Sequence, residues 1–395
     1  MRFSKNRFCT DILAARRGTV DQARAGTRMR IPLSAPDVTE ADIQAVVKVL
    51  RTPRLSIGPV MEEFERAIAD LVGVPYGIAL SSGTAGLHLC LRALGIGPDD
   101  EVIVPSFTFI SVANAVLYER ARPVFVDIDP VTLNLDPAKL ERNITAKTRA
   151  IIAVHTFGYP ADLDPIMEIA REHGLPVIED ACEAIGARYR RRPAGGIGHF
   201  GVFGFYPNKP VTTGEGGMVV TRDSEMAHTI RALRNQGRRD SDGWLEHSLL
   251  GYNYRLSELN CALGLEQVKR IDGILDRREA LAIQYTEELR AVPGVTTPPL
   301  QIQDGRICWF VYVIRVENRD EVMRQLTENG IGCSRYFAPL HRQPLFAGYA
   351  NPRNDLKITE QVAAQTLALP FFNRLTGEQI HEVCCVLRRA VARKT

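Results

Sequence analysis

The sequence predicts an α/β protein whose large domain has a mostly parallel sheet sandwiched between helices, followed by a smaller C-terminal α+β domain. Residues 123–127, 150–154 and 176–180 are short, nearly continuous apolar runs rich in β-branched side chains. Such runs are typical of strands that are buried on both faces. A helical stretch, 163–172, lies between two of them, and this alternation favours parallel strands joined by helical crossovers.

Composition limits the classes of function. The 395 residues suffice for two or three domains, and 45% hydrophobic and 24% charged residues are ordinary for a globular protein. No apolar run approaches the roughly 20 residues that span a bilayer. Residues 1–28 contain seven basic and two acidic residues, a charge of +5. The whole chain carries +3, so the remaining residues together carry −2. We therefore expect neither a nucleic-acid partner nor a membrane anchor.

The eight cysteines are scattered and have no metal-binding spacing. We expect no metal site. Without a secretory signal we also expect reduced thiols and a cytoplasmic location.

We divide the chain into three parts. Residues 1–28 form a basic extension that is either a disordered tail or sequence upstream of a natural start at Met29. Residues 29–270 form the large domain, and residues 271–395 form a linking helix and the small domain. Within this last part we expect a long helix at 272–292, a strand at 308–316, a helix at 319–329, a second strand at 331–337 and a terminal helix at 376–393.

Two helices precede the first strand. Thr39 is a suitable cap for a helix whose apolar residues recur with helical spacing up to Leu50, and Pro53 follows its end. A second helix carries apolar residues from Met61 to Leu71, and Gly73 is a typical helix-ending residue. These elements indicate packing and no chemistry.

A strand at 76–80 leads into Ser82-Gly83-Thr84 and then into a helix. The free N–H groups at a helix start attract an anion such as a phosphate, and glycine lets it approach closely. The same three residues also make an ordinary helix cap, and we regard the phosphate site and the helix cap as about equally supported.

Three residues stand at or beyond the ends of predicted strands, where α/β proteins bind ligands. Asp180 is either a helix cap or a charge partner for a cationic cofactor ring. Phe109 is either a core residue or a surface on which a planar ring stacks. His155 is either catalytic or a satisfied polar contact, and we favour the contact.

The segment 201–220 places Lys209 between an apolar run and a glycine-rich turn. Partial burial disfavours the ammonium form, so such a lysine is a candidate imine-forming nucleophile. For an isolated lysine in such a turn, the surface interpretation would be the better one. The surrounding motifs reverse that judgement.

Seven motifs in order resemble the DegT/StrS-type nucleotide-sugar aminotransferases, which are pyridoxal-phosphate (PLP) enzymes of the aspartate-aminotransferase fold (fold type I). The resemblance covers about residues 31–387. The motifs are Gly58-Pro59 before Glu62-Glu63-Phe64-Glu65, Ser82-Gly83-Thr84-Ala85, Pro105-Ser106-Phe107-Thr108-Phe109, Glu179-Asp180-Ala181, Lys209 with Thr212-Thr213-Gly214-Glu215-Gly216-Gly217, Gly251-Tyr252-Asn253-Tyr254-Arg255 and Pro339-Leu340-His341.

The resemblance implies roles for these residues. Lys209 would form an imine with PLP, and Asp180 would keep the pyridine nitrogen protonated. Phe109 would stack on the ring, and Gly83 and Thr84 would hold the phosphate. Asn253 would reach the phosphate of a neighbouring subunit, which implies a homodimer with shared active sites.

The resemblance also implies the substrates. We expect glutamate as amino donor and a nucleotide-linked keto-sugar as acceptor. Thr212 to Gly217 favour a 4-keto-6-deoxyhexose over a 3-keto sugar. The segment 234–246, which includes Arg238, and the loop around Tyr336 and His341 would select the sugar and nucleotide. The alternatives are a cyclitol aminotransferase, a PLP lyase or a PLP-binding regulator without turnover.

Two positions depart from the family pattern. Many relatives have a serine on the phosphate where this chain has Gly204. Glu183 replaces a Gln or His that lies near the phenolic oxygen of the cofactor, where an ionised carboxylate would be repulsive. Glu183 is therefore either protonated there or turned away.

Overall fold

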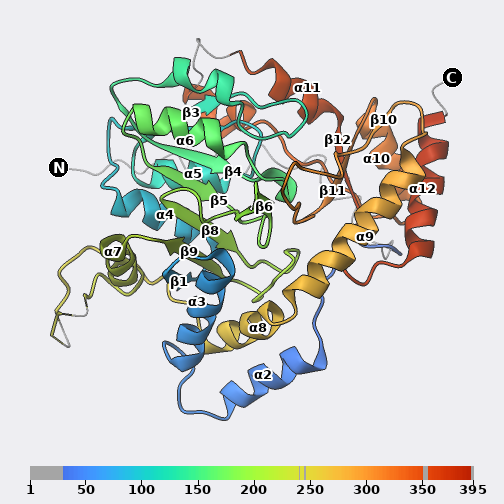
Figure 1. Cartoon of the computed structure of the whole chain (residues 1–395). Helices are drawn as coiled ribbons and strands as arrows, with labels where there is room; N and C mark the ends of the chain where they lie inside the picture. Colours follow the sequence, from blue (N-terminus) through green and yellow to red (C-terminus); the bar gives the residue numbers. More distant parts are fainter. Residues whose placement is uncertain (1–29, 240, 244–245, 350–354, 393–395) are drawn as a thin grey trace, which may run out of the picture.

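The computed structural model describes residues 30–239, 241–243, 246–349 and 355–392. The predicted extension at 1–28 lies outside these residues. A seven-stranded sheet forms the centre of the large domain, with helices on both faces (Figure 1). Only β9 runs antiparallel to its neighbours, so the sheet is mostly parallel, as predicted. Its strand order is β1 (Tyr76–Leu80), β9 (Gly217–Thr221), β8 (Phe200–Gly204), β5 (Val177–Asp180), β4 (Thr148–Val154), β2 (Glu101–Pro105) and β3 (Arg122–Val126).

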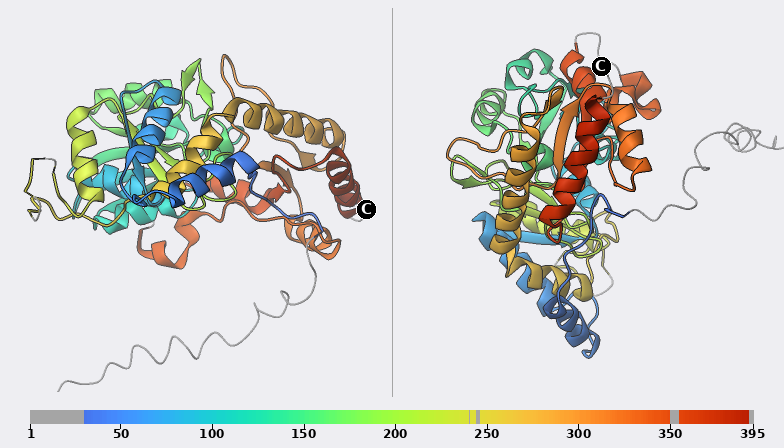
Figure 2. Two further views of the ribbon diagram at one scale, coloured as in Figure 1. Left: turned by 90° about the horizontal axis from the view of Figure 1, so that it is seen from below. Right: turned by 90° about the vertical axis from the view of Figure 1, so that its right-hand side faces the viewer.

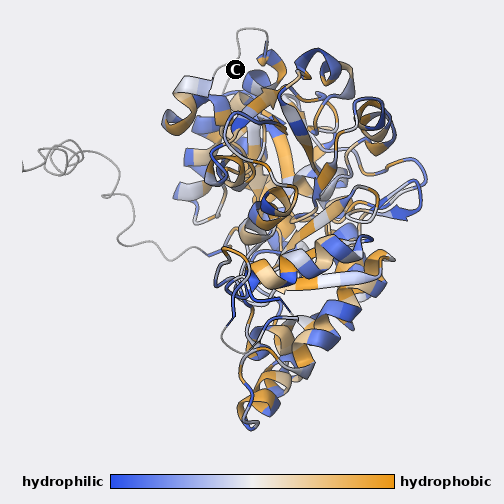
Figure 3. Ribbon diagram, turned by 90° about the vertical axis from the view of Figure 1, so that its left-hand side faces the viewer, coloured by the Kyte–Doolittle hydropathy of each residue, from blue (hydrophilic) through white to orange (hydrophobic). Residues whose placement is uncertain are grey.

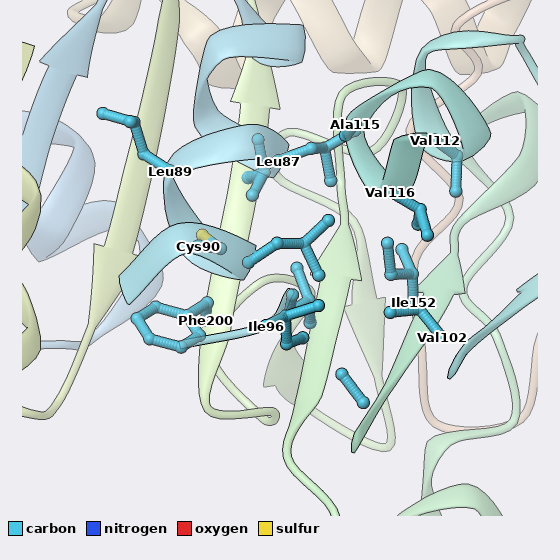
Figure 4. Close-up of a cluster of buried hydrophobic side chains, with 14 of the residues drawn as sticks. Leu87, Leu89, Cys90, Ile96, Val102, Val112, Ala115, Val116, Ile152 and Phe200 are labelled. Carbon is cyan, nitrogen blue, oxygen red and sulfur yellow. The ribbon is translucent and has the colours of Figure 1, made fainter. Parts of the chain in front are cut away.

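The strands are buried on both faces because consecutive side chains enter different cores. Ile152 belongs to the core beneath one set of helices, while its neighbour Ile151 belongs to the core on the opposite face. Figure 4 shows the first of these cores, in which Leu87 and Val116 meet the sheet. Its helices are α4 (Gly83–Ala93), α5 (Ser111–Tyr118) and α7 (Ser224–Arg234); those of the other face are α3 (Pro59–Val72), α6 (Leu163–Glu172) and α8 (Glu258–Val268).

The first helices begin and end where the sequence predicts. Helix α2 (Glu40–Leu50) starts with a capping box between Thr39 and Asp42. Helix α3 ends at Gly73, whose positive φ of 74° is readily adopted by glycine.

The C-terminal part is built on a three-stranded antiparallel sheet of β10 (Val295–Thr296), β11 (Tyr312–Val316) and β12 (Thr366–Leu369). The long helix α9 (Ile271–Leu289) connects it to the large domain and lies beside α12 (Gly377–Ala392) (Figure 2). Helix α10 (Arg319–Glu328) packs against α12, and α11 (Lys357–Gln365) precedes β12. A small hairpin, β6 (Arg188–Tyr189) with β7 (Arg192–Pro193), completes the set.

One predicted strand in this part starts too early, and another prediction is wrong. The strand predicted at 308–316 starts only at Tyr312, because Trp309 adopts a positive φ of 54°. Its neighbours bond elsewhere: the N–H groups of Cys308 and Phe310 donate to the carbonyls of Gly158 and Phe157. The segment 331–337 makes only isolated bridges, and β12, which the sequence did not predict, pairs with β11 instead.

Polar residues gather on the outer faces of the helices and apolar residues on the strands between them (Figure 3). Within the described residues, none of the helices is long and apolar enough to cross a membrane.

Candidate active site

Two predicted site residues, Asp180 and Lys209, lie where parallel strands end. Asp180 is the last residue of β5, which pairs in parallel with β8. The chain leaves β8 into a turn in which the N–H of Lys209 donates to the carbonyl of Tyr206, at 2.9 Å. Both charged residues therefore lie at the same edge of the sheet.

Lys209 lies between a carboxylate and an aromatic ring. Its Nζ is 3.4 Å from Oε1 of Glu183 and 3.8 Å from the centre of the Phe310 ring. Only 14% of its side chain is exposed. Lys209 is thus no surface lysine, and its Nζ lies over the face of the Phe310 ring.

Glu183 points toward Lys209, with its Oε1 3.4 Å from Nζ. Its Oε2 accepts the N–H of Phe157 at 2.8 Å. Burial raises the pKa of Glu183 above its ordinary value, while the Lys209 ammonium opposes the rise. The carboxyl group therefore holds a proton more readily than an exposed glutamate.

This raised pKa predicts a pH-dependent effect on stability. Because folded Glu183 binds its proton more tightly than in the unfolded chain, its contribution is present below its ordinary pKa and is lost as pH rises through the folded pKa. We expect Glu183→Gln to gain melting temperature relative to the native chain as pH rises from 4 to 8. Thermal unfolding of cofactor-free protein measures this, with Glu168→Gln as control because Glu168 is 65% exposed. Parallel melting curves for Glu183→Gln and the native chain would contradict the assignment.

The predicted phosphate turn has the geometry of an anion site. The Ser82 hydroxyl accepts the N–H of Ala85 at 3.1 Å. Among the hydrogen bonds of the described residues, none uses the N–H groups of Gly83 or Thr84. These amides at the start of α4 are therefore available to a ligand.

Cys182 explains both glycines of this corner. A Cβ atom at Gly83 would stand 2.6 Å from Sγ of Cys182, and one at Gly204 would stand 3.3 Å from it. The thiol thus fills the space beside the phosphate turn into which a serine at position 204 would project. Cys182 also lies close to Asp180, whose Oδ1 accepts its N–H at 3.1 Å.

The other predicted residues fall into two groups. Phe109 follows β2 with 57% of its surface exposed, so its ring is accessible to a ligand. Tyr336 stacks on Phe157, and burial together with nearby Glu183 raises its pKa. Asn253 and Arg238 lie instead on the chain segment beyond α7, where Asn253 is exposed and bridges to Asn235.

Two histidines are held by structural contacts. Nδ1 of His341 is 2.7 Å from Oγ of Ser106, and Nε2 is 3.0 Å from Oε1 of Glu360. His155 accepts the N–H of Ala161 on Nδ1 and donates from Nε2 to Glu179 at 2.9 Å. His155 is a satisfied polar contact, as favoured from the sequence.

Arg231 and Arg234, at the end of α7, make contacts within the protein. Arg234 is buried and pairs with Glu65, while Arg231 donates to the carbonyl of Gly77 at 3.1 Å. The guanidinium of Arg234 is therefore already paired inside the protein and is not placed to bind a ligand.

Sequence reasoning missed Phe310, Phe157 and Cys182. The first two read as ordinary core residues, and Phe310 lies 101 positions from Lys209. Only the position of Cys182, two residues after Asp180, could have drawn attention to it.

The sheet, the mostly buried lysine and the unpaired amides at the start of α4 define the class: an α/β transferase of the fold that serves PLP enzymes (fold type I). Within this class the chain belongs to the DegT/DnrJ/EryC1/StrS aminotransferase family, whose family model matches residues 36–388. It is an aminotransferase.

Known relatives cover nearly the whole chain. It is 42% identical to the GDP-perosamine synthase of Caulobacter vibrioides, over 91% of this chain and 97% of the relative. It is 39% identical to the dTDP-3-amino-3,4,6-trideoxy-alpha-D-glucose transaminase of Streptomyces venezuelae, over 87% of this chain and 90% of the relative. The PLP form of the putative sugar aminotransferase Spr1654 from Streptococcus pneumoniae superposes with a TM-score of 0.88 at 26% identity, over 92% of this chain and 99% of that one.

Proposed function

We propose that this aminotransferase uses PLP to transfer an amino group from glutamate to a nucleotide-linked keto-sugar, for the synthesis of amino sugars. The single observation that carries the proposal is the position of Lys209, mostly buried between Glu183 and Phe310 at the carboxyl edge of the sheet. The names of the two sequence relatives, both nucleotide-sugar enzymes, support the substrate class.

The residues of this edge fit PLP. The unused amides of Gly83 and Thr84 suit its phosphate. The carboxylate of Asp180 suits a protonated ring nitrogen, and the exposed Phe109 ring suits its planar face. Because Gly204 lacks a hydroxyl, the amides at the start of α4 would bind a larger share of the phosphate.

Bound PLP would supply a carbonyl carbon that accepts an amino group and a ring that delocalises the electron pair left by a departing proton. Lys209 would anchor it covalently until the amino donor takes its place. The released Nζ would then remove the proton from the donor α-carbon and later deliver one to the sugar carbon. Asp180 would keep the proton on the ring nitrogen, and Glu183 would hold Nζ beside it.

The finer substrate assignment rests on fewer residues. The run Thr212 to Gly217 favours a 4-keto-6-deoxyhexose. Tyr336, His341 and Arg238 are our candidates for substrate selection. Because Asn253 is exposed on a segment beyond α7, we assign it to the cofactor phosphate of a partner subunit in a homodimer.

A panel of nucleotide 4-keto- and 3-keto-sugars with glutamate tests this function. We expect mass spectrometry to detect an amino sugar, and NMR of the product to place the nitrogen on C4. Turnover of a cyclitol ketone, without turnover of any nucleotide sugar, would replace the proposed substrate class.

A further inference from the structure

A buried histidine sits directly behind the phosphate turn. His88 lies four residues after Thr84 on α4, so the two share one face of the helix. His88 is 4% exposed. Three tyrosine rings enclose its imidazole, with ring centres at 5.3 Å (Tyr118), 4.8 Å (Tyr252) and 5.8 Å (Tyr254).

The hydrogen bonds of His88 set its tautomer. Nε2 is 2.8 Å from Oε1 of Glu119, a carboxylate that also pairs with Arg92 at 3.1 Å. Because a carboxylate only accepts, Nε2 carries the hydrogen. Burial lowers the pKa of His88 although Glu119 opposes this, which favours the neutral ring. Nδ1 then accepts a hydrogen bond from the Tyr254 hydroxyl, at 3.2 Å.

The two tyrosines flank Asn253 on an extended segment. The N–H groups of Tyr252 and Tyr254 donate to the carbonyls of Leu233 and Arg234, at the end of α7. Their rings stack on each other at 5.0 Å and turn inward to His88. Alternate residues of an extended chain point to opposite sides, and Asn253 is accordingly exposed.

We propose that His88 and Tyr254 are positioning residues that hold Asn253 in the orientation in which it binds the cofactor phosphate of the partner subunit. This inference rests on the proposed function. Because His88 is buried, it acts on Asn253 only through its neighbours. Its imidazole fixes the Tyr254 ring, and the ring fixes the backbone on which Asn253 is presented.

Tyr254→Phe removes only the hydroxyl that His88 holds and keeps both the ring stack and the backbone hydrogen bonds. We expect the dissociation constant of PLP, titrated into apoprotein by absorbance, to rise about three- to tenfold, as for one lost hydrogen bond. Tyr118→Phe is the matched control, because Tyr118 packs against the same imidazole but is 53% exposed. We expect it to leave the constant unchanged.

Mixed dimers separate an effect across the interface from one within the chain. In each, one chain carries Lys209→Ala, so that only the other chain attaches PLP covalently. Tyr254→Phe on the Lys209→Ala chain should weaken PLP at the partner's lysine. The same change on the lysine-bearing chain should leave that site unchanged. Weakening that follows the lysine-bearing chain, or no weakening in either dimer, would overturn the inference.

Asn253→Ala in the same mixed dimers separates the two claims. If Asn253→Ala weakens PLP across the interface but Tyr254→Phe does not, the positioning role fails and the shared site stands. If Asn253→Ala has no effect across the interface, the assignment of Asn253 itself fails, and the positioning role fails with it.

Discussion

Lys209→Ala is expected to abolish covalent PLP attachment and to lower the rate of amino transfer about 10⁴-fold or more. The side chain serves twice in the proposed mechanism, as the anchor of the cofactor and as the base that moves the α-proton, and either loss alone is large. The measurements are the visible absorbance of the attached cofactor and the turnover of the identified substrate.

Lys269→Ala is the matched control for this change. Lys269 is 60% exposed, and among the described residues its side chain pairs only with Glu266, three residues before it. It should retain full absorbance and activity. A Lys209→Ala protein that keeps the absorbance band would show that another residue attaches the cofactor.

Asp180→Asn is expected to lower the rate about a hundredfold or more while PLP still attaches to Lys209. Asparagine keeps the shape of the side chain, and its carbonyl oxygen can still accept the N–H of Cys182. It carries no charge, so it cannot hold a proton on the ring nitrogen, and removing one such electrostatic contact costs about 10²–10³ in rate.

Single-turnover rates with glutamate measure this effect, and the absorbance band checks attachment. Asp223→Asn, at the cap of α7, is the control, because asparagine can cap a helix equally well. An Asp180→Asn enzyme with an unchanged single-turnover rate would remove Asp180 from the mechanism.

The sequence was a good guide where local signals agree with burial. The runs that became β3, β4 and β5 were recognisable because strands covered on both faces are apolar throughout. The caps at Thr39 and Gly73 were recognisable because each motif supplies its own hydrogen-bond partners.

The segment 331–337 was wrongly predicted as a strand, because its apolar residues pack in the core without forming a continuous set of strand hydrogen bonds. Phe337, for example, packs against Phe107 and Phe157. The true third strand, β12, directly follows α11 in the chain, so no turn residue marks its start.

Some residues of the candidate site could be predicted from the sequence and others could not. Lys209, Asp180 and the phosphate turn belong to motifs that can be read along the chain. The Phe310 ring on Lys209 and the His88 imidazole behind the turn depend on contacts between distant segments, which no local pattern reveals.

The most direct test of amino transfer through Lys209 is the half-reaction with glutamate alone. PLP-loaded enzyme is mixed with glutamate, and both the absorbance of the attached cofactor and the released 2-oxoglutarate are followed. We predict that the band disappears and that one 2-oxoglutarate forms per subunit. A band that persists with no 2-oxoglutarate, in enzyme that has bound PLP, would contradict the account.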